Sequence, residues 1–273
     1  MPANLEGPIG VFDSGVGGLT VVAEIRRRLP HEEIIYFGDT ARLPYGNKSP
    51  ETVRRYSREI ARFLEGKGIR FLVVACNTSS SYALDILPHE VTVPVLGMIE
   101  PGASAAVSAT SNGRVGLIGT RATVASGAYA RAIGMMDPSI QVFSQACPLF
   151  VPLVEEGWAE DKISLDVTRR YLTPILEREI DTLILGCTHY PVLMATLARV
   201  AGPGVKLLSS ATSAVDALVK IIGESPASPE VGRGGVTFYV TDAGTHFREI
   251  GQRILGEAID DLTPVEEERL VLP

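Results

Sequence analysis

FLVVACNTSS, at residues 71–80, and TLILGCTHYP, at residues 182–191, share one pattern. Each has a four-residue, largely apolar run, then a small residue, a cysteine and a threonine within two positions. An apolar run without alternation is typical of a strand that is covered on both faces. The recurrence of this pattern indicates two related α/β halves, each with a cysteine at a strand end.

Further β-prone runs extend this pattern along the chain. The predicted strands are residues 8–12, 34–37, 71–75, 93–96, 115–118, 140–143, 182–185, 205–208 and 236–240. Segments of helical period lie between them, such as 53–64 and 165–180, the latter with a kink expected at Pro174. Thr120 follows one strand at an N-cap position. Alternating strands and helices predict an α/β fold of open, mainly parallel sheets with helices on both faces.

The polar residues at strand ends are the candidates for chemistry. Ligands of open parallel sheets bind beyond the carboxyl ends of the strands, and helix amides there stabilise anions, thiolates included. Four clusters occupy such places: Asp13-Ser14, Gly38-Asp39-Thr40, Cys76-Asn77-Thr78 and Cys187-Thr188-His189. Cys76 and Cys187 stand in matching contexts, which favours a pair that acts together.

Some of these residues also admit structural interpretations. Cys147, which precedes Pro148, is predicted to be a buried small hydrophobic residue. Asp13 is either a functional carboxylate or a turn and N-cap residue. His189 either tunes Cys187 and serves as an acid or is a satisfied structural histidine.

Other motif interpretations fit less well. The glycine-rich segment at 13–18 lacks both the Gly-Lys-Ser/Thr ending of a P-loop and the dinucleotide fingerprint. A zinc site at Cys76, Cys187 and His189 would lack a second closely spaced ligand pair, and no Cys-x-x-Cys redox motif is present.

Composition limits the class of protein. The chain has 273 residues, 45% hydrophobic and 21% charged, with a formal net charge of −7. It has no basic footprint for nucleic acid and no apolar run long enough for a membrane span. The three cysteines and the absence of a secretory signal predict a cytoplasmic protein with free thiols.

Five blocks of sequence carry a family resemblance. They are IGVFDSGVGGLT (9–20), YFGDTARLPYG (36–46), VVACNTSS (73–80), CPLFVPLVEEG (147–157) and LGCTHYP (185–191). In this order they resemble the glutamate racemases of bacterial wall synthesis. The resemblance implies two similar α/β domains, 1–98 plus 208–273 and 99–207, with the active site in the cleft between them. It also implies a homodimer that uses neither pyridoxal phosphate nor a metal and interconverts L- and D-glutamate for peptidoglycan synthesis.

The resemblance also implies roles for individual residues. Cys187 would remove the α-proton of L-glutamate, and Cys76 that of D-glutamate. Asp13 would support the thiol of Cys76, while His189 and Glu155 would lie near the thiol of Cys187, with Glu156 as the alternative to Glu155. The substrate-binding positions implied are Asp13, Ser14, Tyr45, Gly46, Asn77, Thr78, Thr188 and His189.

Other functions remain open at this point. An aspartate or hydantoin racemase, a single-cysteine decarboxylase and a non-catalytic glutamate-binding protein are the alternatives. Two cysteines at strand ends argue against the decarboxylase, and binding alone would not require two thiols. The Cys-Asn-Thr and Cys-Thr-His-Tyr-Pro motifs, together with the block at 9–20, favour glutamate over aspartate.

Overall fold

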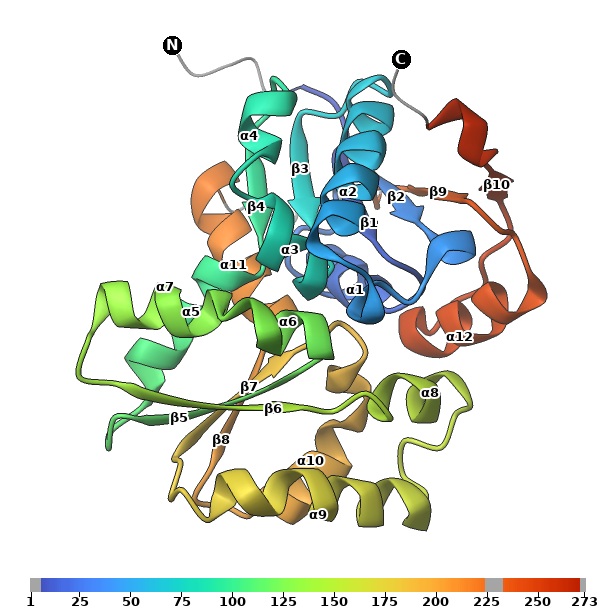
Figure 1. Cartoon of the computed structure of the whole chain (residues 1–273). Helices are drawn as coiled ribbons and strands as arrows, with labels where there is room; N and C mark the ends of the chain where they lie inside the picture. Colours follow the sequence, from blue (N-terminus) through green and yellow to red (C-terminus); the bar gives the residue numbers. More distant parts are fainter. Residues whose placement is uncertain (1–5, 224–232, 271–273) are drawn as a thin grey trace.

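The strands form two separate parallel sheets, one above the other in Figure 1. The structure, a computed structural model, describes residues 6–223 and 233–270. The stretch at 224–235 is rich in Pro, Ser and Gly, which predicts a surface loop, and most of it lies outside the described residues. The strands are β1 Ile9–Asp13, β2 Ile34–Gly38, β3 Phe71–Val74, β4 Val95–Gly97, β5 Arg114–Gly119, β6 Gln141–Ala146, β7 Thr182–Gly186, β8 Lys206–Ser209, β9 Val236–Val240 and β10 Leu262–Pro264. The first sheet has the order β10-β9-β2-β1-β3-β4, and the second β6-β5-β7-β8.

The two sheets repeat one topology. The order β2-β1-β3-β4 in the first sheet corresponds strand for strand to β6-β5-β7-β8 in the second, and the neighbours pair in parallel. The strands β3 and β7, which are followed by Cys76 and Cys187, therefore occupy equivalent places. This confirms the predicted α/β fold and the relation between its halves. The three-residue edge strand β10 was not predicted.

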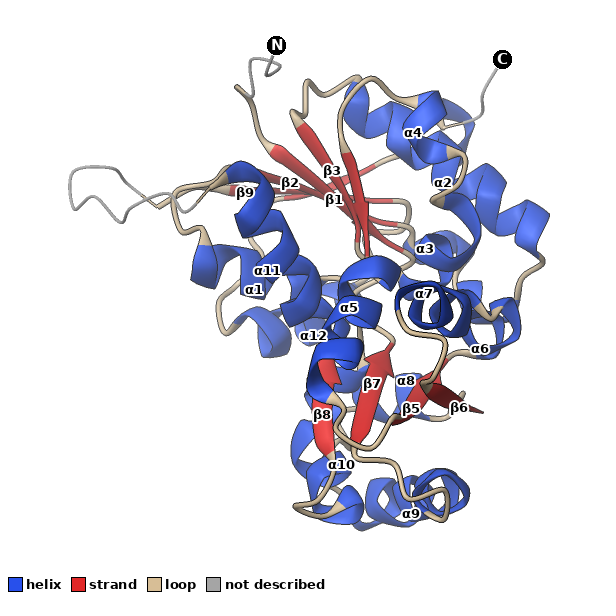
Figure 2. Ribbon diagram, turned by 90° about the vertical axis from the view of Figure 1, so that its left-hand side faces the viewer, coloured by secondary structure: helices blue, strands red, loops and turns tan. Residues whose placement is uncertain are grey.

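Twelve helices are described, and they cover both sheets. They are α1 Leu19–Arg28, α2 Pro50–Glu65, α3 Asn77–Ala83, α4 Leu87–Glu90, α5 Ile99–Ala109, α6 Arg121–Ser126, α7 Ala128–Met136, α8 Phe150–Glu155, α9 Lys162–Leu176, α10 Met194–Ala201, α11 Ser210–Ile222 and α12 Thr245–Leu255. In Figure 2 the first sheet lies between α1 and α11 on one side and α2 and α4 on the other. No helix in the described part of the chain is long and apolar enough to cross a membrane.

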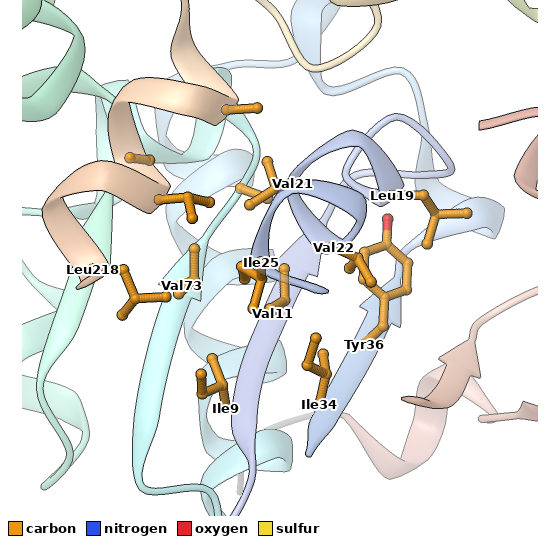
Figure 3. Packing of buried hydrophobic residues seen from close by; sticks show 14 of the residues in the cluster. Ile9, Val11, Leu19, Val21, Val22, Ile25, Ile34, Tyr36, Val73 and Leu218 are labelled. Atoms are coloured by element: carbon orange, nitrogen blue, oxygen red, sulfur yellow. The ribbon is translucent and has the colours of Figure 1, made fainter. Parts of the chain in front are cut away.

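Alternate residues of each strand enter different cores, as a doubly covered sheet requires. Ile9 and Val11 of β1 pack with Val21 and Ile25 of α1 (Figure 3). Phe12 of the same strand packs on the opposite face, against α2 and α4. Burial of each such side chain contributes about 1.5–3 kcal/mol, so the cores hold the strand ends in place.

The second sheet is built in the same way. Leu117 and Ile184 face a core that includes side chains of α5 and α7. Ile118 and Leu185, their neighbours in the strands, face the core formed with α8, α9 and α10. The two strands that precede Cys76 and Cys187 thus belong to sheets that are packed on both faces.

Helix boundaries follow local chemistry. Thr120 caps α6, as predicted, by accepting a hydrogen bond from Thr123 N at 3.1 Å. The helix predicted at 165–180 is shifted: α9 begins after Asp161, whose side chain accepts from Ile163 N, and it ends at Leu176. The helix continues through Pro174 but stops two residues later.

The division of the chain into 1–98 plus 208–273 and 99–207 stays a prediction. In the structure, β8 at Lys206–Ser209 is the last strand of the second sheet, and α11 begins at Ser210.

Candidate active site

Residues that follow β1, β3, β5 and β7 line one cavity of about 250 Å³. This volume is close to the lower end of small-molecule pockets, which are typically about 300–1,000 Å³, and suits a compact ligand. Ten of the eleven predicted site residues line the cavity: Ser14, Tyr45, Gly46, Cys76, Asn77, Thr78, Glu155, Cys187, Thr188 and His189. The sequence-based hypothesis therefore selected residues that the fold brings together.

Cys76 stands at the N-cap of α3 and is 5% exposed. Its sulfur accepts a hydrogen bond from Ser79 N at 3.5 Å. Burial, together with the charge of Asp13, raises the pKa of the Cys76 thiol to about 12, although contacts with Ser79 and Ser14 lower it. The expected helix amide is present, but desolvation outweighs it, so Cys76 rests as a thiol.

Asp13, the one predicted residue that does not line the cavity, is fully buried. Its carboxylate accepts hydrogen bonds from Gly15 N at 3.0 Å and from Thr188 Oγ1 at 3.3 Å. Burial raises the pKa of Asp13, and the charge of His189 and the hydrogen bonds only partly oppose this effect. Asp13 is thus a turn residue that also joins the two halves.

Cys187, His189 and Glu155 form a chain of contacts. His189 Nδ1 lies 4.0 Å from Cys187 Sγ, and His189 Nε2 lies 3.1 Å from Glu155 Oε1. Burial lowers the pKa of His189, but its contacts with Cys187 and Glu155 overcome this and raise it to about 10. An imidazolium therefore stands beside Cys187 at neutral pH. Glu155, not the exposed Glu156, is the carboxylate at the cavity.

Several polar side chains at the cavity are already bonded to the protein. Asn77 donates to Ser210 Oγ at 3.1 Å and accepts from the Tyr129 hydroxyl at 2.7 Å. The Thr78 hydroxyl lies 3.0 Å from that of Thr120. The contacts with Tyr129 and Thr120 join residues that follow the first sheet to residues of the second half.

The same cavity includes residues that sequence reasoning missed. Thr120 and Arg121 line it, as do Leu43, Pro44 and Asn47 beside the predicted Tyr45 and Gly46. Thr120 follows β5, the counterpart of β1, so the internal repeat carried a signal for it; Arg121 had none. Asp39, from the cluster after β2, does not line the cavity. Cys147 is fully buried in an apolar core, as predicted.

Within residues 6–223 and 233–270, no group of three or more His, Cys, Asp and Glu side chains could hold a metal ion.

Comparison with known proteins places the chain in a class. Residues 17–218 match the family model described as Asp/Glu/Hydantoin racemase, and the chain belongs to this family of amino-acid racemases. A glutamate racemase from Geobacter metallireducens is 49% identical, over 95% of this chain and 97% of that protein. Within the family, this chain belongs with the glutamate racemases.

Solved structures agree with this assignment. A glutamate racemase isoform from Bacillus anthracis superposes with a TM-score of 0.90 at 38% identity, over 96% of this chain and 98% of that one. The glutamate racemase of Francisella tularensis, solved in complex with D-glutamate, gives a TM-score of 0.87 at 38% identity, over 95% and 97% of the two chains.

Proposed function

We propose that this chain interconverts L- and D-glutamate by two-base proton transfer between Cys76, the substrate and Cys187. The observation that carries the proposal is the meeting of these thiols, from equivalent strand ends, in one cavity of about 250 Å³. Racemisation takes a proton from one face of the α-carbon and returns one to the other face. Two groups on opposite sides accomplish this without turning the substrate over.

Electrostatics favour one resting arrangement of protons. The imidazolium of His189, whose pKa is raised to about 10, lies 4.0 Å from the Cys187 sulfur and contacts Glu155. Cys76 holds its proton because burial and Asp13 raise its pKa to about 12. The conversion of L-glutamate requires an acid at Cys76, and the Cys76 thiol meets this requirement.

In the direction from L to D, the Cys187 thiolate takes the α-proton. The electron pair of the broken C–H bond moves toward the α-carboxylate, and the Cys76 thiol delivers its proton to the opposite face. The products are D-glutamate, a thiol at Cys187 and a thiolate at Cys76, and the reverse reaction restores the starting state. Main-chain donors near Asn77, Thr78 and Thr188 would stabilise the enolate-like charge.

The substrate contacts proposed are at Asp13, Ser14, Tyr45, Gly46, Asn77, Thr78, Thr188 and His189. We expect no cofactor. The family further supports a homodimer in the cytoplasm that supplies D-glutamate for peptidoglycan. Sedimentation of the purified protein tests the dimer.

The reaction is tested by incubation in D₂O with each enantiomer of glutamate, without added cofactor. Deuterium should enter the α-position from both enantiomers, accompanied by inversion. Exchange without inversion would mean one working base, and activity on aspartate alone would correct the substrate. If neither exchange nor inversion is observed with either enantiomer of glutamate or with aspartate, the result would favour a binding protein.

Cysteine variants separate the thiols. Cys76→Ala and Cys187→Ala should each reduce racemisation by at least about 10²-fold, because general acid–base groups contribute about 10²–10⁴-fold. Cys147→Ala is the matched control, since that thiol lies in an apolar core and should leave kcat near the wild-type value. A rate within a few-fold of wild type for either cavity variant removes that thiol from the mechanism.

A further inference from the structure

The strand-end residue Asp39 has no place in the proposed chemistry, yet it is fully buried. Its carboxylate accepts hydrogen bonds from Arg42 Nε at 2.8 and 2.9 Å, from Thr241 Oγ1 at 3.0 Å and from the Tyr45 hydroxyl. A buried carboxylate is costly unless it is paired in this way. Asp39 is therefore the centre of a buried polar network.

Arg42 links this network to helix α2. It is 7% exposed and forms a second ion pair, through its Nη1, with the buried Glu59. Its guanidinium carbon also lies 4.0 Å from the centroid of the Tyr56 ring. The planar fork of arginine thus contacts two carboxylates and one ring at once, a geometry that lysine cannot reproduce.

The chain that leaves Arg42 forms one wall of the cavity. All five residues of 43–47 line it. Tyr45 belongs to the same apolar cluster as Cys76. On the other side, Gly46 packs so closely against Thr120 that a Cβ at Gly46 would lie 2.7 Å from the Thr120 Cβ. The wall therefore touches one thiol and the second half of the molecule.

We propose that Arg42 is a positioning residue, which fixes the wall 43–47 through Asp39 and the Tyr45 hydroxyl and so sets the affinity for substrate. The Tyr45 hydroxyl serves this network, and the wall offers the ligand its main chain. The effect on substrate affinity rests on the proposed function. The effect on the packing around Cys76 does not.

The test is a double-mutant cycle of Arg42→Lys, Tyr45→Phe and the combined variant. Lysine loses the fork, and phenylalanine keeps the ring but loses the hydroxyl. Each single variant should raise KM for D-glutamate about tenfold, since small displacements of positioning groups have effects of this order. The combined variant should show about the same KM as either single variant, because both remove one network.

A second readout does not depend on activity. The rate of alkylation of Cys76 by iodoacetamide, measured by mass spectrometry of peptides, should increase several-fold in both single variants. Cys147 in the same digest is the internal reference. Arg26→Lys is the matched control variant, because Arg26 is also largely buried and paired with a carboxylate, but that carboxylate is Glu257 rather than Asp39. It should leave both readouts unchanged.

The outcomes are distinct. KM values within twofold of wild type, or effects that multiply to about a hundredfold in the combined variant, overturn the proposal. An Arg42→Lys chain that does not fold leaves Tyr45→Phe to decide by the same KM and alkylation criteria. A wild-type protein without racemisation contradicts the proposed function, and faster alkylation of Cys76 in the variants would still support the network.

Discussion

Gly17 offers a sharp test of how His189 is held. A Cβ at this position would lie 2.4 Å from His189 Nδ1 and 2.5 Å from Thr188 Oγ1. Contacts below about 3 Å are not sustained, so Gly17→Ala requires a shift of about 1 Å to reach ordinary van der Waals separation. The groups that must move are the imidazole and the threonine of the second half, or the two halves as wholes.

The expected loss follows from the contacts of His189. Its ring is 4.0 Å from Cys187 Sγ and 3.1 Å from Glu155 Oε1, so a shift of this size breaks at least one contact. A misplacement of about 1 Å near the chemistry costs up to about 10²-fold in rate, and overpacking costs about 1–3 kcal/mol of stability. We therefore expect Gly17→Ala to fold but to lose 10- to about 100-fold in kcat/KM.

Circular dichroism of glutamate at several concentrations gives kcat and KM for this variant, and urea unfolding gives its stability. Gly134→Ala is the matched control, because nothing lies within 4 Å of a Cβ there and the position is in helix α7. It should keep full activity. A folded Gly17→Ala protein with kcat/KM within twofold of wild type would refute the argument that close packing positions His189.

Three further outcomes are expected. Activity from L to D should fall on the alkaline side with a midpoint near pH 10, because the pKa of His189 is raised to about 10 and its ring is an imidazolium only below that pH. A rate that does not change between pH 8 and 11 would contradict this. Arg253→Ala, which removes a 2.9 Å hydrogen bond to the Glu155 carbonyl, should move that midpoint to lower pH, and an unmoved pH profile would disagree. Asp181→Ala should cost about 1–3 kcal/mol in urea unfolding at pH 7, because its carboxylate accepts from Thr110 and from two main-chain N–H groups. Burial raises the pKa of Asp181, but these hydrogen bonds outweigh burial and hold the pKa below its ordinary value. The stabilisation is therefore present above that ordinary value, and the stability of the variant should approach that of wild type as the pH falls below about 4.

The repeated topology was accessible from sequence because each half carries the same local signal. The runs at 71–74 and 182–185 are continuous and apolar, and the sheets place them in equivalent positions. Strand β10 at Leu262–Pro264 gave no such signal. It is short, lies at an edge and includes a proline, so its pairing with β9 depends on tertiary contacts.

The candidate site was likewise predictable from the sequence only in part. The predicted site residues come from the family blocks, and all of them except Asp13 line the cavity. The choice between Glu155 and Glu156 depends on which one the end of α8 turns toward His189, and adjacent identical residues carry no such information. The roles of Asp39 and Arg42 were hidden because charged residues near a turn have the same pattern whether they are exposed or buried.

The matching strand orders also bear on the energetics of a reversible reaction between mirror images. Enantiomers have equal free energies in water, so a catalyst for their exchange must serve forward and backward passage with equal efficiency at low concentration. This equality holds for any catalyst of the reaction, and the two duplicated halves here each supply one thiol. The two thiols nevertheless have different neighbours, because the charge of Asp13 raises the pKa of Cys76 while His189 Nδ1 lies 4.0 Å from Cys187 Sγ.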